Sequence, residues 1–264
     1  MKWFDRLFRK PPRELSDLRD SWEYLASRDP LWAILSRPEK KGGKWKEEEF
    51  FELGRREAAT TIEYLERLNV LKVRARALDF GCGVGRMTQG LCQYFREVVG
   101  VDIAKTMIAL ADRYNACPDR CSYVVNTRED LPFENDTFDF VYTALVLQHI
   151  PPPSGRKYIA EFLRVLRPGG IALFQAPSEL RKEHASPGPP EASAVPSPAP
   201  EPPTSPDPDD HLEKHILMYA IPRGEVEAVC TQAHGTLLDI APDDWAGVEW
   251  VGYRYCVRKD PPAG

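Results

Sequence analysis

The chain has 264 residues, of which 42% are hydrophobic and 10% aromatic, enough for the core of one large domain with appendages. Its 35 lysines and arginines are outnumbered by 40 aspartates and glutamates, which gives a formal net charge of -5. This acidic balance argues against nucleic acid as a partner, because nucleic-acid binders usually present a basic surface. No apolar run approaches the roughly 18 residues of a membrane span, so we expect no transmembrane helix.

The first ten residues, MKWFDRLFRK, are charged throughout and lack the apolar segment of a signal peptide, which predicts a cytoplasmic protein. Trp3, Phe4, Leu7 and Phe8 share one helical face beside basic residues, a pattern that fits a short membrane-surface anchor. So short a segment would bind a membrane weakly, and docking onto the protein's own domain or onto a partner is the alternative.

The six cysteines favour reduced structural thiols over a metal centre. Cys117 and Cys121 lie four residues apart, while the other cysteines are scattered along the chain. Because no second Cys or His pair falls at zinc-binding spacing, we expect no metal site.

Composition and periodicity divide the chain into four regions. Before residue 70 the apolar residues recur at helical spacing, as in Leu15, Leu18 and Trp22, and a second helix is expected over residues 47–68. Residues 185–210 contain ten prolines and no Lys or Arg, which predicts a disordered insert. The expected regions are an N-terminal helical extension or lid (1–70), a core (71–180), the Pro-rich insert (181–210), and a C-terminal helix with a β-hairpin that completes the core (211–264).

From residue 75 onward, short apolar runs alternate with helical periods. RALDF, EVVGVD, SYVVN and IALFQAP are typical of buried strands, and FDFVYTALVL is typical of a buried strand that runs into a turn. Helical segments such as VGRMTQGLCQYF separate the strands. Such strands predict a parallel sheet with helices on both faces, a doubly wound α/β fold. After the insert, PRGEVEAVCTQAH predicts a helix opened by Pro222, and TLLDIA and WVGYRYCVR predict two final strands.

A glycine-rich turn, LDFGCGVGR over residues 78–86, joins the first expected strand to the next helix. Glycine permits a tight turn and a close ligand approach, and the N-terminus of the following helix offers free N–H groups. The glycines are spaced G-x-G-x-G, and the last glycine of the dinucleotide-binding G-x-G-x-x-G pattern would fall at Arg86. This spacing weakens the interpretation as a nicotinamide-dependent oxidoreductase.

Asp102 ends the second expected strand, 17 positions after Gly85. A carboxylate at that position can accept hydrogen bonds from both hydroxyls of a ribose. The alternative is that Asp102 caps the helix AKTMIALA, and the two roles are compatible. Together with the glycine turn, Asp102 indicates an adenosine-type ligand that need not be a dinucleotide.

Four segments, LDFGCGVGR, VVGVDIAKTMIALA, DLPFENDTFDFVYTALVLQHI and FLRVLRPGGIALF, resemble in order and spacing the class I S-adenosylmethionine-dependent methyltransferases. The resemblance covers about residues 75–176. It implies a seven-stranded, mostly parallel sheet with an antiparallel last strand. It also implies S-adenosyl-L-methionine as the cofactor and methyl transfer as the reaction.

The resemblance further implies which residues bind the cofactor. Asp79 and the glycine turn would surround its methionine part, and Asp102 with its neighbour would hold the ribose and flank the adenine. The acidic residue that many members carry after the third strand is replaced by Thr127, so Asn126 or the backbone near Arg128 is expected to contact the adenine. The expected cofactor-binding residues are Asp79, Gly81, Cys82, Gly83, Gly85, Asp102, Ile103, Asn126, Thr127, Arg128, Thr143 and Leu145.

His149 follows the fourth strand in LQHI and is the expected catalytic residue. A hydroxyl acceptor benefits from a general base, and a neutral imidazole is a suitable one at physiological pH. The alternative is a structural histidine that stabilises the turn, as in LQHI-like runs of the resembling family. The amine-methylating signature of that family, Asn or Asp before Pro-Pro-aromatic, is replaced here by TALV, which disfavours nucleobase and glutamine amines.

The favoured function is therefore methyl transfer to a small-molecule acceptor, with a hydroxyl as the expected acceptor group. The N-terminal helices could fold over the strand ends as a lid, with Trp45, Phe50 and Phe51 either walling the pocket or packing on their own helix. The Pro-rich insert would act as a tether or a gate. A protein or macromolecule methyltransferase and a non-catalytic S-adenosylmethionine-binding module are the alternatives.

Overall fold

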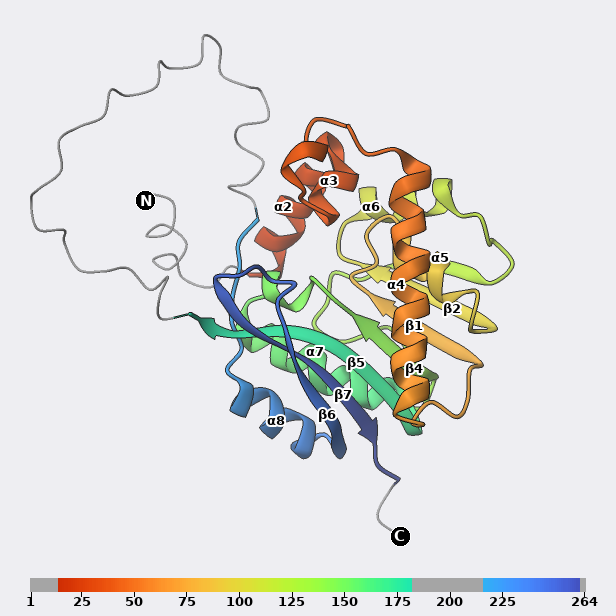
Figure 1. The fold of residues 1–264 in the computed structure, drawn as a ribbon, viewed down its shortest axis with the longest axis vertical. Helices are drawn as coiled ribbons and strands as arrows, with labels where there is room; N and C mark the ends of the chain where they lie inside the picture. The colour runs from red at the N-terminus through yellow and green to blue at the C-terminus, as the bar shows by residue number, and fades with distance from the viewer. Residues whose placement is uncertain (1–13, 182–215, 262–264) are drawn as a thin grey trace, which may run out of the picture.

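One seven-stranded sheet, in the order β3-β2-β1-β4-β5-β7-β6, forms the centre of the computed structural model, which describes residues 14–181 and 216–261. The pairs from β3 to β5 are parallel, whereas β7 runs antiparallel to both of its neighbours (Figure 1). This confirms the predicted doubly wound α/β fold with an antiparallel last strand. The strands are β1 (Arg76–Phe80), β2 (Glu97–Asp102), β3 (Cys121–Val125), β4 (Phe138–Thr143), β5 (Leu166–Leu180), β6 (Gly235–Asp243) and β7 (Trp250–Lys259).

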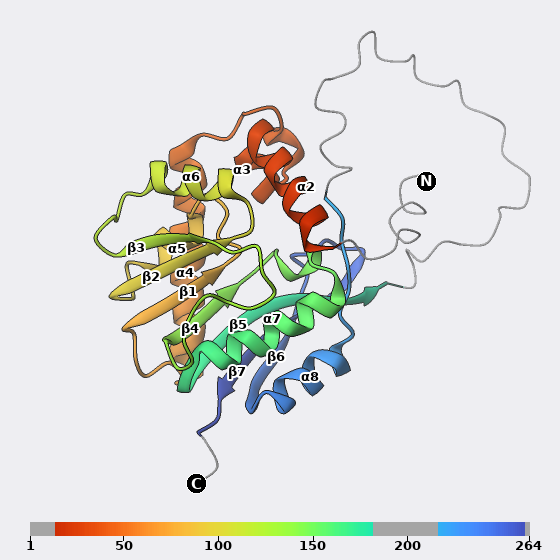
Figure 2. The ribbon, with the colours of Figure 1, turned by 180° about the vertical axis from the view of Figure 1, so that it is seen from behind.

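Helices pack on both faces of the sheet, which is why its central strands are apolar on both sides (Figures 1 and 2). Leu78 and Val141 face one cluster with helices α7 and α8, and Ala77 and Phe140 face another with α4 and α5. Among the described residues no helix is long and apolar enough to cross a membrane. These helices are α4 (Glu47–Arg67), α5 (Arg86–Leu91), α6 (Lys105–Tyr114), α7 (Pro152–Val165) and α8 (Arg223–Gln232).

The helices before residue 70 have two different positions. Helices α2 (Leu15–Arg28) and α3 (Pro30–Ile34) lie near the carboxyl ends of the strands, followed by the 3-10 turn η1 (Pro38–Lys40). Helix α4 belongs to the layer that covers the sheet, because its second half packs against β1 and β4. Helices α2 and α3 thus lie where a lid would lie, whereas α4 lies on the sheet, and the lid itself stays a prediction. The predicted N-terminal anchor and most of the Pro-rich insert lie outside the described residues.

Close packing of α4 on α5 depends on two glycines. A Cβ atom at Gly54 would lie 2.3 Å from the carbonyl oxygen of Arg86, and one at Gly90 would lie 2.6 Å from the carbonyl oxygen of Gly54. Only hydrogen fits in either place. The contact sets the first turn of α5, and with it the side chain of Arg86, against α4.

Two predicted helix boundaries differ from the structure. The helix expected over VGRMTQGLCQYF is only α5, and the chain turns after Leu91. Pro222 precedes α8 at the N-cap position instead of opening it. After α5 the apolar periodicity continues beyond the residues with helical hydrogen bonding, because Cys92 and Phe95 in the following turn are buried in the same core.

Candidate active site

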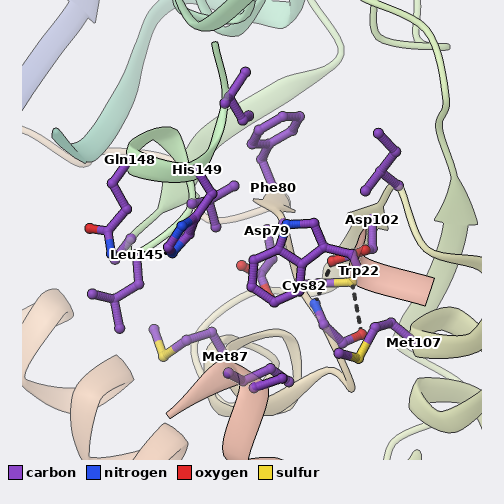
Figure 3. A pocket seen from close by; sticks show the side chains of 18 of the residues that line it. Trp22, Asp79, Phe80, Cys82, Met87, Asp102, Met107, Leu145, Gln148 and His149 are labelled. Atoms are coloured by element: carbon purple, nitrogen blue, oxygen red, sulfur yellow. Dashed lines mark hydrogen bonds between the residues drawn. The ribbon is translucent and has the colours of Figure 1, made fainter. Parts of the chain in front are cut away.

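The main cavity lies at the carboxyl ends of β1, β2 and β4, where ligands of open α/β sheets bind. Its volume of about 450 Å³ falls within the roughly 300–1,000 Å³ of ligand pockets. Figure 3 shows Gln148 and His149 on one side of this cavity and Asp102 on the other, with Asp79 and Trp22 overlapping between them in this view. The predicted residues that line it are Asp79, Gly81, Cys82, Gly83, Asp102, Ile103, Asn126, Leu145 and His149.

The glycine turn forms the floor of the cavity, and its conformation requires glycine. Gly81, Gly83 and Gly85 have φ angles of 72°, 52° and 83°, in the left-handed region that L side chains rarely adopt. A Cβ atom at Gly81 would lie 2.4 Å from a methyl carbon of Val146, and one at Gly83 would lie 2.5 Å from Ile34. At Gly81 and Gly83 the turn therefore presents backbone without a side chain to the cavity, on either side of Cys82.

Gly85 differs from the other two glycines, because it does not line the cavity. A Cβ atom there would lie 2.4 Å from the hydroxyl oxygen of Tyr123. Gly85 also precedes α5 as its N-cap residue. Its role in the structure is to let the turn pass Tyr123 closely, and no contact with a ligand is needed to explain it.

Asp102 ends β2 with its carboxylate fixed by two backbone donors. One oxygen accepts the N–H of Gly83 at 2.9 Å, and the other accepts the N–H of Ala104 at 2.9 Å. Burial raises the pKa of Asp102 to about 6, although these hydrogen bonds oppose the shift. The carboxylate thus links the glycine turn to the start of α6 and borders the cavity.

The amides that open α6 are capped by a residue from α2. Glu23 accepts the N–H of Lys105 at 2.5 Å and the N–H of Thr106 at 3.2 Å. Asp102 accepts the N–H of Ala104, the residue that precedes the helix, and Glu23 accepts the first N–H groups of the helix itself. The helix-capping role considered for Asp102 is therefore mainly supplied by Glu23, which also ties the N-terminal helices to the edge of the cavity.

Asp79, near the end of β1, is the other carboxyl group in the cavity lining and is only 3% exposed. It accepts a hydrogen bond from the hydroxyl of Thr88 at 2.6 Å. Burial raises its pKa to about 7, against the opposing effects of Thr88 and Arg86. The neighbouring Cys82 thiol is also buried, and burial raises its pKa well above the usual value. All six cysteines of the chain are free.

Two of the residues predicted after β3 do not border the cavity. Asn126 lines it and is 5% exposed, whereas Thr127 and Arg128 do not. The Asn126 amide donates to the carbonyl oxygens of Arg128 and Asp130, at 3.0 and 3.1 Å, and its oxygen accepts the N–H of Arg128. Asn126 therefore fixes the loop after β3 as well as bordering the cavity.

Within the run FDFVYTALVL, strand β4 ends at Thr143, and the chain then enters the predicted turn, with a sharp change of direction at Leu145. Leu145 has a φ of 62°, a strained value for a residue other than glycine. Its N–H donates to the side-chain oxygen of Gln175 on β5 at 3.3 Å. Leu145 lines the main cavity, while Thr143 lines only an adjoining one.

His149, 8% exposed, lies in the 3-10 turn η2 (Leu147–His149) at the side of the cavity. Its Nδ1 is 2.7 Å from the carbonyl oxygen of Leu217, so Nδ1 carries the proton and donates it. Burial lowers the pKa of His149 to about 4, which keeps the ring neutral at physiological pH. The ring also packs edge-on against Trp22, with centroids 5.4 Å apart.

Residues far from the motifs complete the cavity. Leu18 and Trp22 of α2, Ile34 of α3 and Trp245 of the loop after β6 all line it. Trp45, Phe50 and Phe51, the aromatics considered for this role, instead form a buried cluster with α2, α3 and α6. The helical stripe of α2 was visible in the sequence, but nothing local indicated which surface it covers.

The chain matches the sequence profile of a family described as "Methyltransferase domain" over residues 78–174. A demethylmenaquinone methyltransferase from Clavibacter sepedonicus is 37% identical over 105 residues, which are 39% of this chain and 42% of that protein. A probable methyltransferase from Aspergillus luteorubrus is 32% identical over 126 residues, 44% of this chain and 42% of the other. The chain thus spans less than half the length of these curated relatives.

Solved structures share the fold across nearly the whole chain. Magnesium protoporphyrin IX methyltransferase from Synechocystis, with bound S-adenosylhomocysteine, has a TM-score of 0.60 at 12% identity and covers 93% of this chain and 99% of its own. The [4+2]-cyclase SpnF has a TM-score of 0.61 at 14% identity, with coverage of 95% and 98%. At such identities these structures show the fold alone. With the profile match, they confirm the resemblance: residues 78–174 are a methyltransferase domain of the class I fold.

The pKa of Asp102 predicts how nucleoside affinity depends on pH. Only the ionised carboxylate can accept both ribose hydroxyls, so affinity for S-adenosylhomocysteine should fall about ten-fold between pH 7 and pH 5. Calorimetric titrations at both pH values measure this change. Asp79 titrates nearby, with a pKa of about 7, so Asp102→Asn is the comparison that isolates the contribution of Asp102.

The stability of the unliganded protein should respond in the opposite sense. The pKa of folded Asp102 lies above the roughly 3.9 of an unfolded aspartate. Its contribution to the free energy of unfolding is therefore present at low pH and is lost as the pH rises through about 6. If the wild type and Asp102→Asn show the same pH dependence of affinity and of melting temperature, Asp102 is not the group responsible.

Proposed function

We propose that this protein transfers a methyl group from S-adenosylmethionine to a small molecule, with a hydroxyl as the acceptor group. The observation that carries the proposal is the cavity in which the backbone of Gly81 and Gly83 and the fixed Asp102 carboxylate face the same space. Those two features match the two ends of a nucleoside amino acid: an amino-acid part that needs close backbone approach, and a ribose that needs hydrogen-bond acceptors.

The residues present fit that cofactor. Gly81 and Gly83 border the cavity with backbone alone, and Asp102 would accept the ribose hydroxyls. Ile103 and Asn126 border the same part of the cavity and would flank the adenine. Asp79, the other carboxyl group that lines the cavity, would lie near the cationic amino group of the cofactor. The cofactor supplies an electrophilic methyl group on its sulfonium when bound.

The protein's own part in such a displacement is to position the two reactants and to exclude water. Trp22 and Leu18 bring apolar surface over the cavity, and Glu23 anchors their helix to α6 beside Asp102. The strained backbone at Leu145 places that residue at the wall shared with the adjoining cavity. The position of α2 and the binding of the nucleoside are thereby coupled through the start of α6, where Glu23 and Asp102 both accept backbone N–H groups.

We assign His149 a positioning role in place of the general-base role predicted for it. Its Nδ1 proton is committed to Leu217, and a pKa of about 4 makes its other nitrogen a weak base near pH 7. The contact fixes residues 216–222, where the chain returns after the Pro-rich segment, against the η2 turn. Asp243 lines the adjoining cavity, and burial raises the pKa of its carboxyl group, which makes it the better-suited proton acceptor for a hydroxyl.

The experiment is a screen for S-adenosylhomocysteine formation by mass spectrometry. The purified protein is incubated with S-adenosylmethionine and hydroxyl-bearing small molecules, their amine analogues, or a mixture of cellular proteins and RNA. We expect turnover with hydroxyl compounds only. Methylated protein or RNA would favour the macromolecular alternative. Nucleoside binding without turnover on any substrate would favour a binding module or another chemistry on this fold, as in the cyclase.

A further inference from the structure

A second cavity of about 410 Å³ adjoins the first. The two share a wall that includes Leu35, Arg37, Tyr142, Leu145 and Trp245. The second cavity extends from this wall between α4, the middle of β5 and the first half of the antiparallel β7. A molecule held there would lie next to the nucleoside cavity, on the side of Leu145.

Three buried nitrogen atoms of residues that line this second cavity find no hydrogen-bond partner among the described residues. They are Nε of Arg86, Nε2 of Gln175 and Nε of Arg254. A buried donor without a partner destabilises the protein, so such groups usually have a ligand, ion or water to bind. All three are N–H donors, and their natural partners are oxygen atoms.

The strand register places two of these donors side by side. Gln175 of β5 is the direct cross-strand partner of Arg254 of β7, so both side chains stand on the same face of the sheet. The Gln175 oxygen accepts the N–H of Leu145, which leaves its amide nitrogen free to donate. The Arg254 guanidinium packs over the ring of Tyr64, with its carbon 4.2 Å from the centroid.

The charges around the cavity leave a positive excess. Arg86 pairs with Glu57 at 2.7 Å, and Arg56 pairs with Glu52 at 2.9 Å. Arg37 and Arg254 also line the cavity, and neither forms an ion pair within the described parts of the chain. The remaining carboxyl group in the lining is Asp243. Two unpaired arginines thus face one carboxyl group, an arrangement that attracts an anion.

The rest of the lining is apolar. Leu53 and Leu173 form part of the wall, and Trp245, which is 44% exposed, lies in the lining of both cavities. Such a cavity fits a molecule with an apolar body and one polar end. The polar end belongs beside Gln175 and Arg254, the apolar body between α4 and Trp245.

We propose that the second cavity is the acceptor site and that it selects a small amphipathic molecule bearing an anionic carboxylate or phosphate group, bound by Arg254 and Gln175. This inference rests on the proposed function, because it takes the first cavity as the nucleoside site. The anionic group anchors the acceptor, and the hydroxyl to be methylated lies toward Leu145. Neither Arg254 nor Gln175 lines the nucleoside cavity.

The test uses calorimetry with simple probes, titrated with and without saturating S-adenosylhomocysteine. Benzoate and phenylacetate test the carboxylate, phenyl phosphate tests the phosphate, and benzamide and phenylacetamide are neutral counterparts. We expect at least one anion to bind at least ten-fold more tightly than its neutral counterpart. Equal binding of anions and amides, or no binding of any anion, would overturn the proposal.

Two variants assign the effect to the named residues. Arg254→Met removes the charge, and Gln175→Glu keeps an acceptor for the N–H of Leu145 while placing a carboxylate where the ligand's would bind. Each should weaken the anion at least ten-fold and leave affinity for S-adenosylhomocysteine unchanged. Arg258→Met, on the exposed end of the same strand, is the control. Undiminished anion binding in Arg254→Met would overturn the proposal, whereas failure of wild type to bind S-adenosylhomocysteine would contradict the proposed function instead.

Discussion

Replacing Asp102 with alanine is expected to weaken binding of S-adenosylmethionine at least ten-fold. The carboxylate would accept two ribose hydroxyls, and hydrogen bonds to a charged group contribute about 1.5–3 kcal/mol each. Loss of one such bond alone accounts for a ten-fold change, since a factor of ten corresponds to about 1.4 kcal/mol. Isothermal calorimetry on wild type and variant measures the ratio directly.

The same carboxylate also holds the structure of the site, because it accepts the N–H groups of Gly83 and Ala104. Asp102→Asn retains one acceptor oxygen and should fall between wild type and alanine. Asp112→Ala, an exposed aspartate on the neighbouring helix α6, is the matched control and should bind like wild type. Unchanged affinity in a folded Asp102→Ala protein would remove the ribose assignment.

Gly81→Ala should lower the free energy of unfolding by about 3 kcal/mol and reduce cofactor affinity at least ten-fold. A left-handed φ costs an L residue about 1–2 kcal/mol, and the contact with Val146 adds an overpacking cost of about 1–3 kcal/mol. In a domain of 150–250 residues, each kcal/mol of lost stability lowers the melting temperature by about 2–4 °C. Thermal denaturation and nucleoside titration provide the two measurements.

Further substitutions separate the two causes. Gly81→Ala with Val146→Ala removes the contact and keeps the backbone strain, so it should recover part of the lost stability. Gly224→Ala is the control, because that glycine has an ordinary φ and open space around its Cβ position. If Gly81→Ala behaved like Gly224→Ala in both assays, the turn would not need glycine in the way the structure indicates.

The strands were predictable where a short apolar run is bounded on both sides by polar or turn residues. RALDF and EVVGVD coincide with β1 and β2 residue for residue. IALFQAP captured only the middle of β5, which runs from Leu166 to Leu180 because it pairs with β7 up to the Leu180–Trp250 partners. That pairing joins segments on opposite sides of the Pro-rich insert, and no local pattern shows it.

The residues of the site also fall into a group that local sequence predicts and a group that it does not. The glycine turn and Asp102 could be recognised because each depends on its neighbours in sequence: a strand end, a tight turn and the next helix. Trp22, the Glu23 contact with α6, and the Gln175–Arg254 pair come from tertiary packing between distant segments. Sequence periodicity indicates that such residues lie on a buried face and does not indicate what that face contacts.

The role of His149 shows a related limit. A histidine after β4 was correctly expected near the cavity, and its neighbourhood determines what it can do there. The carbonyl oxygen of Leu217, far along the chain, takes its Nδ1 proton, and burial lowers the pKa of the ring. The residues LQHI indicate neither the hydrogen bond to Leu217 nor the burial of the ring, so the sequence could not distinguish a general base from a positioning residue.

The most direct measurement is calorimetric titration of the purified protein with S-adenosylmethionine, S-adenosylhomocysteine and NAD. We predict that both sulfur nucleosides bind at a single site and that NAD gives no binding heat, because the glycine turn and Asp102 are arranged for one nucleoside with an amino-acid tail. Binding of NAD, or failure of both sulfur nucleosides to bind a folded protein, would contradict the assignment of the main cavity and the methyl-transfer function built on it.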